Sequence, residues 1–112
     1  KRQYNDSTIA IGPGKVQLLE AIAEAGSISA AARSLGMSYR RAWVLVDEMN
    51  RALQTPAVNT SAGGAHGGGA SLTSTGEAIV RHYRSIETTA RMAAAADIAA
   101  LTRLLNPQGT SA

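Results

Sequence analysis

The sequence predicts a small, mainly α-helical domain that carries one β-hairpin and ends in a long C-terminal helix. Three observations favour this class. The chain has 112 residues, about the size of a single domain. Ala fills 22 positions, Leu, Ile and Val together fill 21, and Phe is absent; this composition suits a thin core between closely spaced helices. Apolar residues recur at helical spacing in several segments, and Gly, Ser and Pro separate these segments.

The composition also excludes several classes of protein. Without Cys, the chain has no disulfide, thiolate metal site or Cys nucleophile, and it suits a reducing cytoplasm. No apolar run approaches the roughly 18 residues of a membrane span, and residues 1–6 lack the apolar core of a signal peptide. We therefore expect a cytoplasmic protein without a membrane partner. The net charge of +3 permits a polyanionic partner without requiring one.

The first elements follow from breakers and helical spacing. Residues 7–11 are strand-like and stop at the Gly-Pro-Gly run of residues 12–14. A helix is predicted over residues 15–25, and Gly26 ends it. Its apolar positions are Val16, Leu18, Leu19, Ile22 and Ala23, whereas Lys15, Glu20 and Glu24 take the other side.

Two closely linked helices come next. Ser29 is suited to cap a helix of about two turns that Gly36 ends in the left-handed conformation. Ser38 is the predicted cap of a second helix over residues 39–53. The apolar line of this second helix is Ala42, Val46, Met49 and Leu53.

A hairpin and a long helix complete the chain. Residues 57–60 and 70–73 are strand-like, and five of the nine residues in the intervening segment 61–69 are Gly. This pattern predicts a hairpin with a long tip. Ser74 to Glu77 matches the capping-box pattern, so a helix is predicted from residue 74 to 105. Its apolar stripe is Ile79, Tyr83, Ile86, Ala90, Ala94, Ile98, Leu101 and Leu105.

Such a helix would be about 45 Å long at about 1.5 Å per residue, which is more than so small a domain can cover. We therefore expect a second copy of the chain to cover the stripe, giving a homodimer. The chain would divide into a domain over residues 1–73, a dimerisation helix over 74–105 and a tail over 106–112. The residues predicted for the dimer contact are Ile79, Tyr83, Ile86, Ala90, Ile98 and Leu101.

This order of elements is that of a winged helix-turn-helix, in which residues 39–53 would read the DNA major groove. Arg can donate two parallel hydrogen bonds to guanine, so Arg40 or Arg41 is predicted to recognise a base. Ser27, Ser29 and the open amides of the short helix would hold a phosphate. Ser38 and Tyr39 share the leading turn with the two Arg residues. In the alternative interpretation, the Arg pair is simply solvated on a surface helix.

Trp43 and the tip of the hairpin each allow two interpretations. Trp43 lies off the core line, so it either braces the recognition helix against the hairpin or touches sugar and base methyl groups. The tip, with His66, Gly67 and Gly68, either lies along the minor groove or the phosphate backbone, or is a flexible loop.

Motifs for catalysis, phosphate binding and metal binding are missing. Gly69 is followed by Ala70 and Ser71, so the Gly-rich tip fits no phosphate-binding loop. His66 and His82 are sixteen residues apart with no partner at metal-ligand spacing. We therefore expect no enzymatic activity, no metal and no cofactor in this chain.

Several runs form a further pattern: Gly26 to Ala32, Gly36 to Trp43, Asp47 to Asn50, Gly63 to Thr73 and Gly76-Glu77. Together these runs resemble the amino-terminal domain of the ModE family of molybdate-responsive regulators. The resemblance covers about residues 14–86; the run 26–32 by itself is shared with the wider LysR-type regulators. It implies a dimeric DNA-binding repressor, often of molybdate uptake genes. That family holds molybdate in carboxy-terminal β-domains, so molybdate is expected only if such a domain exists.

Together these observations predict a transcriptional regulator that binds a palindromic site in double-stranded DNA as a homodimer. The alternative is a protein-interaction module, in which the helix-turn-helix and the long helix serve assembly instead.

Overall fold

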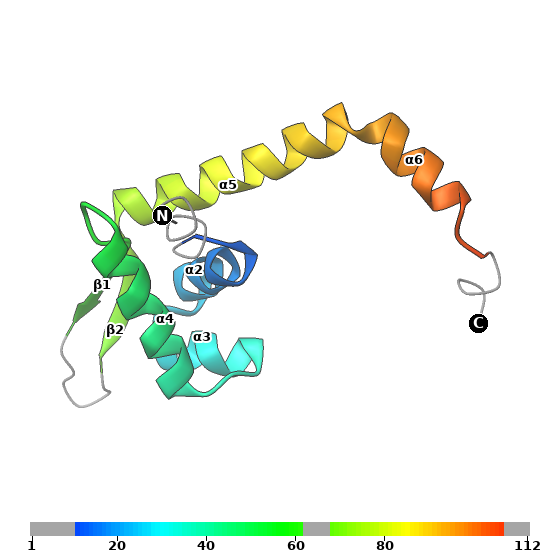
Figure 1. Ribbon diagram of the computed structural model, residues 1–112. Coiled ribbons are helices and arrows are strands. Elements are labelled where there is room, and N and C mark those ends of the chain that lie inside the picture. The colour runs from blue at the N-terminus through cyan, green and yellow to red at the C-terminus, as the bar shows by residue number, and fades with distance from the viewer. Residues whose placement is uncertain (1–10, 62–67, 107–112) are drawn as a thin grey trace, which may run out of the picture. The chain divides into compact units, whose positions relative to one another are not determined.

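The computed structural model describes residues 11–61 and 68–106 (Figure 1). The chain forms two compact units, Lys1–Arg81 and His82–Ala112. The predicted strand over residues 7–11 falls almost wholly outside the described residues. No helix in the described ranges is both long and apolar enough to cross a membrane.

The first unit opens with α2 (Pro13–Ala25), which Pro13 starts and Gly26 ends. The Gly26 N–H donates to the carbonyl of Ile22 at 2.9 Å, and its φ of 82° is the left-handed conformation that Gly favours. Two predictions for this helix were wrong. Lys15 is buried, because its ammonium lies 3.3 Å from a Glu48 carboxylate on α4. Ala23 is exposed, and its single methyl makes this exposure inexpensive.

Helix α3 (Ile28–Leu35) begins earlier than the sequence predicts. Ser27 has an extended backbone and its Oγ accepts from the Ala30 N–H at 3.0 Å, so Ser27 caps the helix. The prediction that Ser29 is the cap was wrong, because Ser29 lies inside the first turn. The left-handed stop at Gly36, with φ 70°, is confirmed.

Helix α4 (Tyr39–Ala52) starts at the predicted cap, where the Ser38 Oγ accepts from the Arg41 N–H at 3.0 Å. The helix ends one residue before the predicted end. Its buried positions Ala42, Val46 and Met49 confirm most of the predicted core line, while Leu53 packs against the core and is only partly buried.

The core lies between α2, α3, α4 and the hairpin. Ala31 of α3 and Ala42 of α4 are fully buried, and such small side chains let helices approach closely. The largest fully buried side chains are Leu18, Leu19, Ile22, Met49 and Val16.

The predicted hairpin is confirmed and will be called the wing. Strands β1 (Val58–Ser61) and β2 (Gly69–Leu72) pair antiparallel, with Val58 opposite Leu72 and Ser61 opposite Gly69. The outer edge of β2 is also anchored, since the Ala70 N–H donates to the Gly26 carbonyl at 2.9 Å. The wing is therefore fixed to the end of α2 through main-chain atoms.

Helix α5 (Ser74–Ala93) is capped by Thr73, so the prediction of a capping box starting at Ser74 was wrong. The Thr73 Oγ1 accepts from the Gly76 N–H at 3.0 Å and donates to the Pro56 carbonyl at 2.7 Å. Thr73 thus joins the end of β2, the loop before β1 and the start of α5. Further along the helix, the partly buried Ile79 and Val80 pack against the core of the first unit.

The second unit contains the rest of α5 and then α6 (Ala95–Arg103), so the single helix predicted over residues 74–105 is interrupted. Ala94 has φ −99° and ψ 11°, which is not helical. The hydrogen bonds on both sides survive, from Ala94 to Ala90 at 3.0 Å and from Ile98 to Ala94 at 2.9 Å. The interruption is therefore confined to one residue.

Candidate nucleic-acid interface

Helix α4 presents a row of side chains opposite its buried line. Because an α-helix turns 3.6 residues per turn, the positions opposite Ala42 and Val46 fall one turn apart. We call these positions the outward row; they are Arg40, Val44, Asp47 and Arg51. Arg40, Val44 and Arg51 are exposed, so the first turns of the row are available to a ligand.

On the flank of α4 that faces the wing, Tyr39 and Trp43 line a groove of about 660 Å³. The groove lies between α4, the first turns of α3 and the two strands. Most of its lining is polar, so it suits a polar ligand. The lining residues are Ser27, Ile28, Ser29, Arg33, Tyr39, Trp43, Thr60, Ser61, Gly68 and Gly69.

Trp43 is 45% exposed, while its ring lines this groove beside the wing. The position is compatible with both interpretations that the sequence allowed, because the ring reaches the wing side of α4 and still faces solvent. Trp43 is therefore available for contact with a ligand in the groove.

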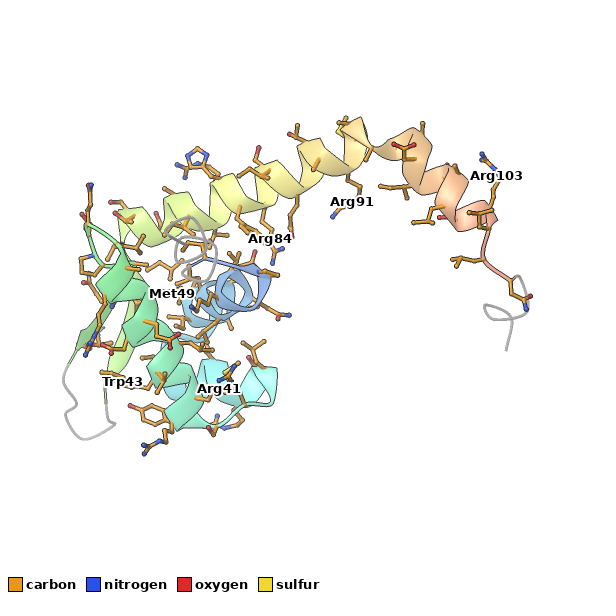
Figure 2. All side chains as sticks on the ribbon, in the orientation of Figure 1. Arg41, Trp43, Met49, Arg84, Arg91 and Arg103 are labelled. Atoms are coloured by element: carbon orange, nitrogen blue, oxygen red, sulfur yellow. The ribbon has the colours of Figure 1, made fainter. Side chains whose placement is uncertain are left out.

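Arg41 lies on the other flank of α4, and Figure 2 shows Arg41 and Trp43 on opposite sides of this helix. It lines a second, smaller cavity of about 320 Å³ with Leu45 and the beginning of α2. Arg40 and Arg41 are both exposed but point to different surfaces. They are therefore two separate cationic contacts.

The acidic side chains of α4 are neutralised locally. Asp47 accepts from Arg51 at 3.0 Å, and Glu48 pairs with Lys15 at 3.3 Å. Within residues 11–61 and 68–106, neither Arg40 nor Arg41 forms an ion pair. The leading turn of α4 therefore presents uncompensated positive charge, which attracts an anionic ligand.

A model of the bacterial regulatory helix-turn-helix proteins of the lysR family matches residues 14–77. The chain belongs to this lysR family. The family consists of regulators and not of enzymes.

Curated relatives of this LysR-type chain carry molybdenum-related names. The chain is 49% identical over 77 residues to the molybdenum-pterin-binding protein MopB of Rhodobacter capsulatus. It is 43% identical over 82 residues to the molybdenum transport protein ModE of Azotobacter vinelandii. It is 41% identical over 71 residues to the DNA-binding transcriptional dual regulator ModE of Escherichia coli K12. The matches cover 69%, 73% and 63% of this chain but 28%, 30% and 27% of the relatives.

The crystal structure of the CbnR_DBD–DNA complex has the same fold. It superimposes with a TM-score of 0.62 at 24% sequence identity, over 81% of this chain and 99% of that chain. The mainly α-helical winged helix-turn-helix predicted from the sequence is thus confirmed.

The structure brings together five of the eight predicted DNA-binding residues that it describes in this LysR-type domain. Ser27, Ser29, Tyr39, Trp43 and Gly68 share the groove. Ser38 is used as a cap, and its hydroxyl is partly committed to the Arg41 amide. The predicted contacts His66 and Gly67 lie outside the described residues.

Sequence reasoning missed Arg33, Thr60, Ser61 and Gly69, which also line the groove. The sequence places Arg33 in a short helix. Whether its side chain reaches the groove depends on how α3 crosses α4, which the sequence does not show. Thr60 ends the strand predicted over residues 57–60 and Ser61 follows it, but no sequence signal showed which face of the wing would meet α4. The Ser and Thr hydroxyls beside a Gly-rich tip were the one available signal.

Of the predicted dimer residues in the second unit, Tyr83 is partly buried and the others are exposed. Ile86 and Leu101 are each 64% exposed and Ile98 is 43% exposed. No group of three or more His, Cys, Asp or Glu side chains in the described parts of the chain could hold a metal ion.

Proposed function

We propose that this chain is the DNA-binding part of a transcriptional regulator that binds double-stranded DNA as a homodimer at a palindromic operator and represses molybdenum-related genes. The observation that carries the proposal is the surface formed by Arg40, Trp43 and the groove beside the wing. Family membership and the DNA in the CbnR_DBD complex support it.

In this proposal α4 enters the major groove with its leading turn first. The outward row faces the base edges, and Arg40 donates two hydrogen bonds to a guanine. One sugar-phosphate strand runs through the groove between α4 and the wing. Ser29 and the first-turn amides of α3 bind a phosphate there, and Arg33, Thr60 and Ser61 extend that contact.

The second unit supplies the dimer contact. Its exposed apolar side chains would be buried against the same unit of a second copy, because water disfavours so many clustered apolar groups. Two-fold symmetry then places the two α4 helices in successive major grooves, with half-sites about one helical turn or a multiple of it apart.

The first test compares Arg40→Ala with Arg91→Ala in electrophoretic mobility shifts on a duplex selected from a random pool. Both variants lose one exposed positive charge, but Arg91 lies in the second unit. We expect Arg40→Ala to lose about 1 to 3 kcal/mol of binding free energy and to relax the preference at one base pair. Arg91→Ala should bind like the parent chain.

Equal weakening of Arg40→Ala on all duplexes would make Arg40 a phosphate anchor. The same measurements on Arg41→Ala show which of the two Arg residues recognises the base, since their side chains point to different surfaces. If the parent chain retards no duplex at low salt, the protein-interaction module becomes the better hypothesis.

The link to molybdenum rests on the names of the relatives, each of which is more than three times as long as the region matched. We propose that this part of the chain needs no cofactor and that any response to molybdate comes from a further domain. Equilibrium dialysis with molybdate should show no binding to this chain. A reporter behind the selected site, with and without the chain, tests repression.

A further inference from the structure

Large apolar side chains are exposed at only one place among the described residues of the first unit. They are Tyr39, Trp43 and Val44, with exposed fractions of 54%, 45% and 44%. All three lie in the first two turns of α4. Clustered apolar groups on a monomer mark a contact surface more often than scattered ones do.

Val44 has the most outward position of the three. It lies two residues from Ala42 and from Val46, which are both buried, so it points away from the core. Tyr39 and Trp43 belong to the groove beside the wing, and Leu45 belongs to the cavity on the other flank. Val44 lines neither cavity and is adjacent in the outward row to Arg40.

The neighbours of Val44 identify the kind of partner. Arg40 lies one turn before it, and Asp47, which lies almost one turn after it, is neutralised by Arg51. The surface is thus apolar at Val44 and positively charged one turn earlier, at Arg40. This charge is complementary to the negative charge of DNA at the major groove. The apolar group that base edges present there is the C5-methyl of thymine.

We propose that Val44 contacts thymine C5-methyl groups and makes this chain selective for thymine at the positions it reaches. The inference rests on the DNA-binding function proposed above. Arg40 and Val44 are four residues apart, about 6 Å along the helix axis at about 1.5 Å per residue. The guanine read by Arg40 and a thymine read by Val44 therefore lie within about two base pairs.

Deoxyuridine tests the contact, because it differs from thymidine only by the missing methyl. A preferred duplex is selected from a random pool, and each thymine is replaced in turn by deoxyuridine. We expect the parent chain to bind about fourfold more weakly at one or two replaced positions, since one buried CH₂ or CH₃ is worth about 0.8 kcal/mol. Val44→Ala should bind the thymine and uracil duplexes equally.

Two control variants separate this contact from general weakening. Leu104→Ala also shortens an exposed aliphatic side chain, but just after the end of α6, and should keep the fourfold ratio. Arg40→Ala should keep the ratio too, while losing its response to replacement of the guanine. Circular dichroism of Val44→Ala should match the parent chain, because position 44 is outside the core.

Equal binding of the parent chain to the thymine duplex and to every uracil duplex would overturn the assignment. The assignment would also be overturned if the Val44→Ala variant still distinguished thymine from uracil, because another side chain would then contact the methyl group. Failure to select any duplex would instead refute DNA binding itself, and the inference with it.

Discussion

Asn50 joins α4 to the wing through a single side chain. Its Oδ1 accepts from the N–H groups of Ala57 at 2.8 Å and Val58 at 3.3 Å, and its Nδ2 donates to the Val58 carbonyl at 3.2 Å. Asn50 is on the same flank of α4 as Trp43, so these bonds set the wing beside the groove.

We expect Asn50→Leu to lower the free energy of unfolding by about 1 to 3 kcal/mol, because main-chain groups of Ala57 and Val58 lose their partners. Asn50→Asp should cost less, since a carboxylate still accepts from both N–H groups. Urea denaturation measures both. Asn59→Ala, an exposed Asn on β1, is the control, and an equal loss there would show that the bonds of Asn50 are not special.

The sequence predicts correctly the roles of residues that interact only with residues close to them in the chain. Gly26, Gly36 and Ser38 end or start helices through bonds to residues three or four positions away. Arg33, Thr60 and Ser61 could not be assigned, because they meet only when α3, α4 and the wing pack. Their place in the groove depends on tertiary structure, and the local sequence does not determine it.

At the scale of elements, α3 offers two candidate caps two residues apart. We expect Ser27→Ala to lower the free energy of unfolding by about 1 kcal/mol, because the Ala30 N–H loses its acceptor. Ser29→Ala, the matched control inside the first turn, should leave it within about 0.5 kcal/mol. Thermal unfolding monitored by circular dichroism is the measurement. A larger loss of stability in Ser29→Ala than in Ser27→Ala would show that Ser29 is the cap, as the sequence predicts.

The start of α5 is closely packed. A Cβ on Gly76 would collide with the carbonyl oxygen of Ala57, whereas a Cβ on Gly14 in α2 would meet nothing within 4 Å. Gly76→Ala should therefore destabilise the fold even though Ala favours helix by about 1 kcal/mol over Gly. Gly14→Ala should be neutral or stabilising. Urea midpoints of the two variants decide, and a stable Gly76→Ala would contradict the tight contact.

The sequence predicts the end of an element correctly where only one residue suits a cap. Where two neighbouring residues both suit the cap, the prediction can select the wrong one. Thr73 and Ser74 can both cap a helix, and Thr73 is selected because its hydroxyl also reaches the Pro56 carbonyl. The interruption at Ala94 had no signal at all. It falls in a run of Ala, the best helix former, so sequence reasoning extended the helix through it.

For the whole molecule, the proposed homodimer depends on the exposed apolar side chains of the second unit. Ile98→Asp should give monomers in sedimentation velocity, because the dimer would have to bury a charge. Ala99→Asp adds the same charge at the adjacent position, which is also exposed but lies off the apolar stripe, and should leave the mass unchanged. A dimer that persists in Ile98→Asp would place the contact elsewhere.

The fold class was predictable because the order of the helices and strands can be inferred along the sequence. That order is two helices with a short link, a Gly-rich hairpin and a terminal helix. The family match over residues 14–77 covers this part of the chain. The predicted division at residue 73 stays a prediction. The compact units instead divide at Arg81, inside α5, since the first turns of that helix pack on the core.

The bond from Ala70 to the Gly26 carbonyl has a consequence for sequence variation. Only peptide groups take part in it, so the outward side chains of the two strands can be exchanged without detaching the hairpin from its support. In the proposed complex with DNA, preferences for the sequence that flanks the bound site can therefore drift among homologues while the position of the wing is retained.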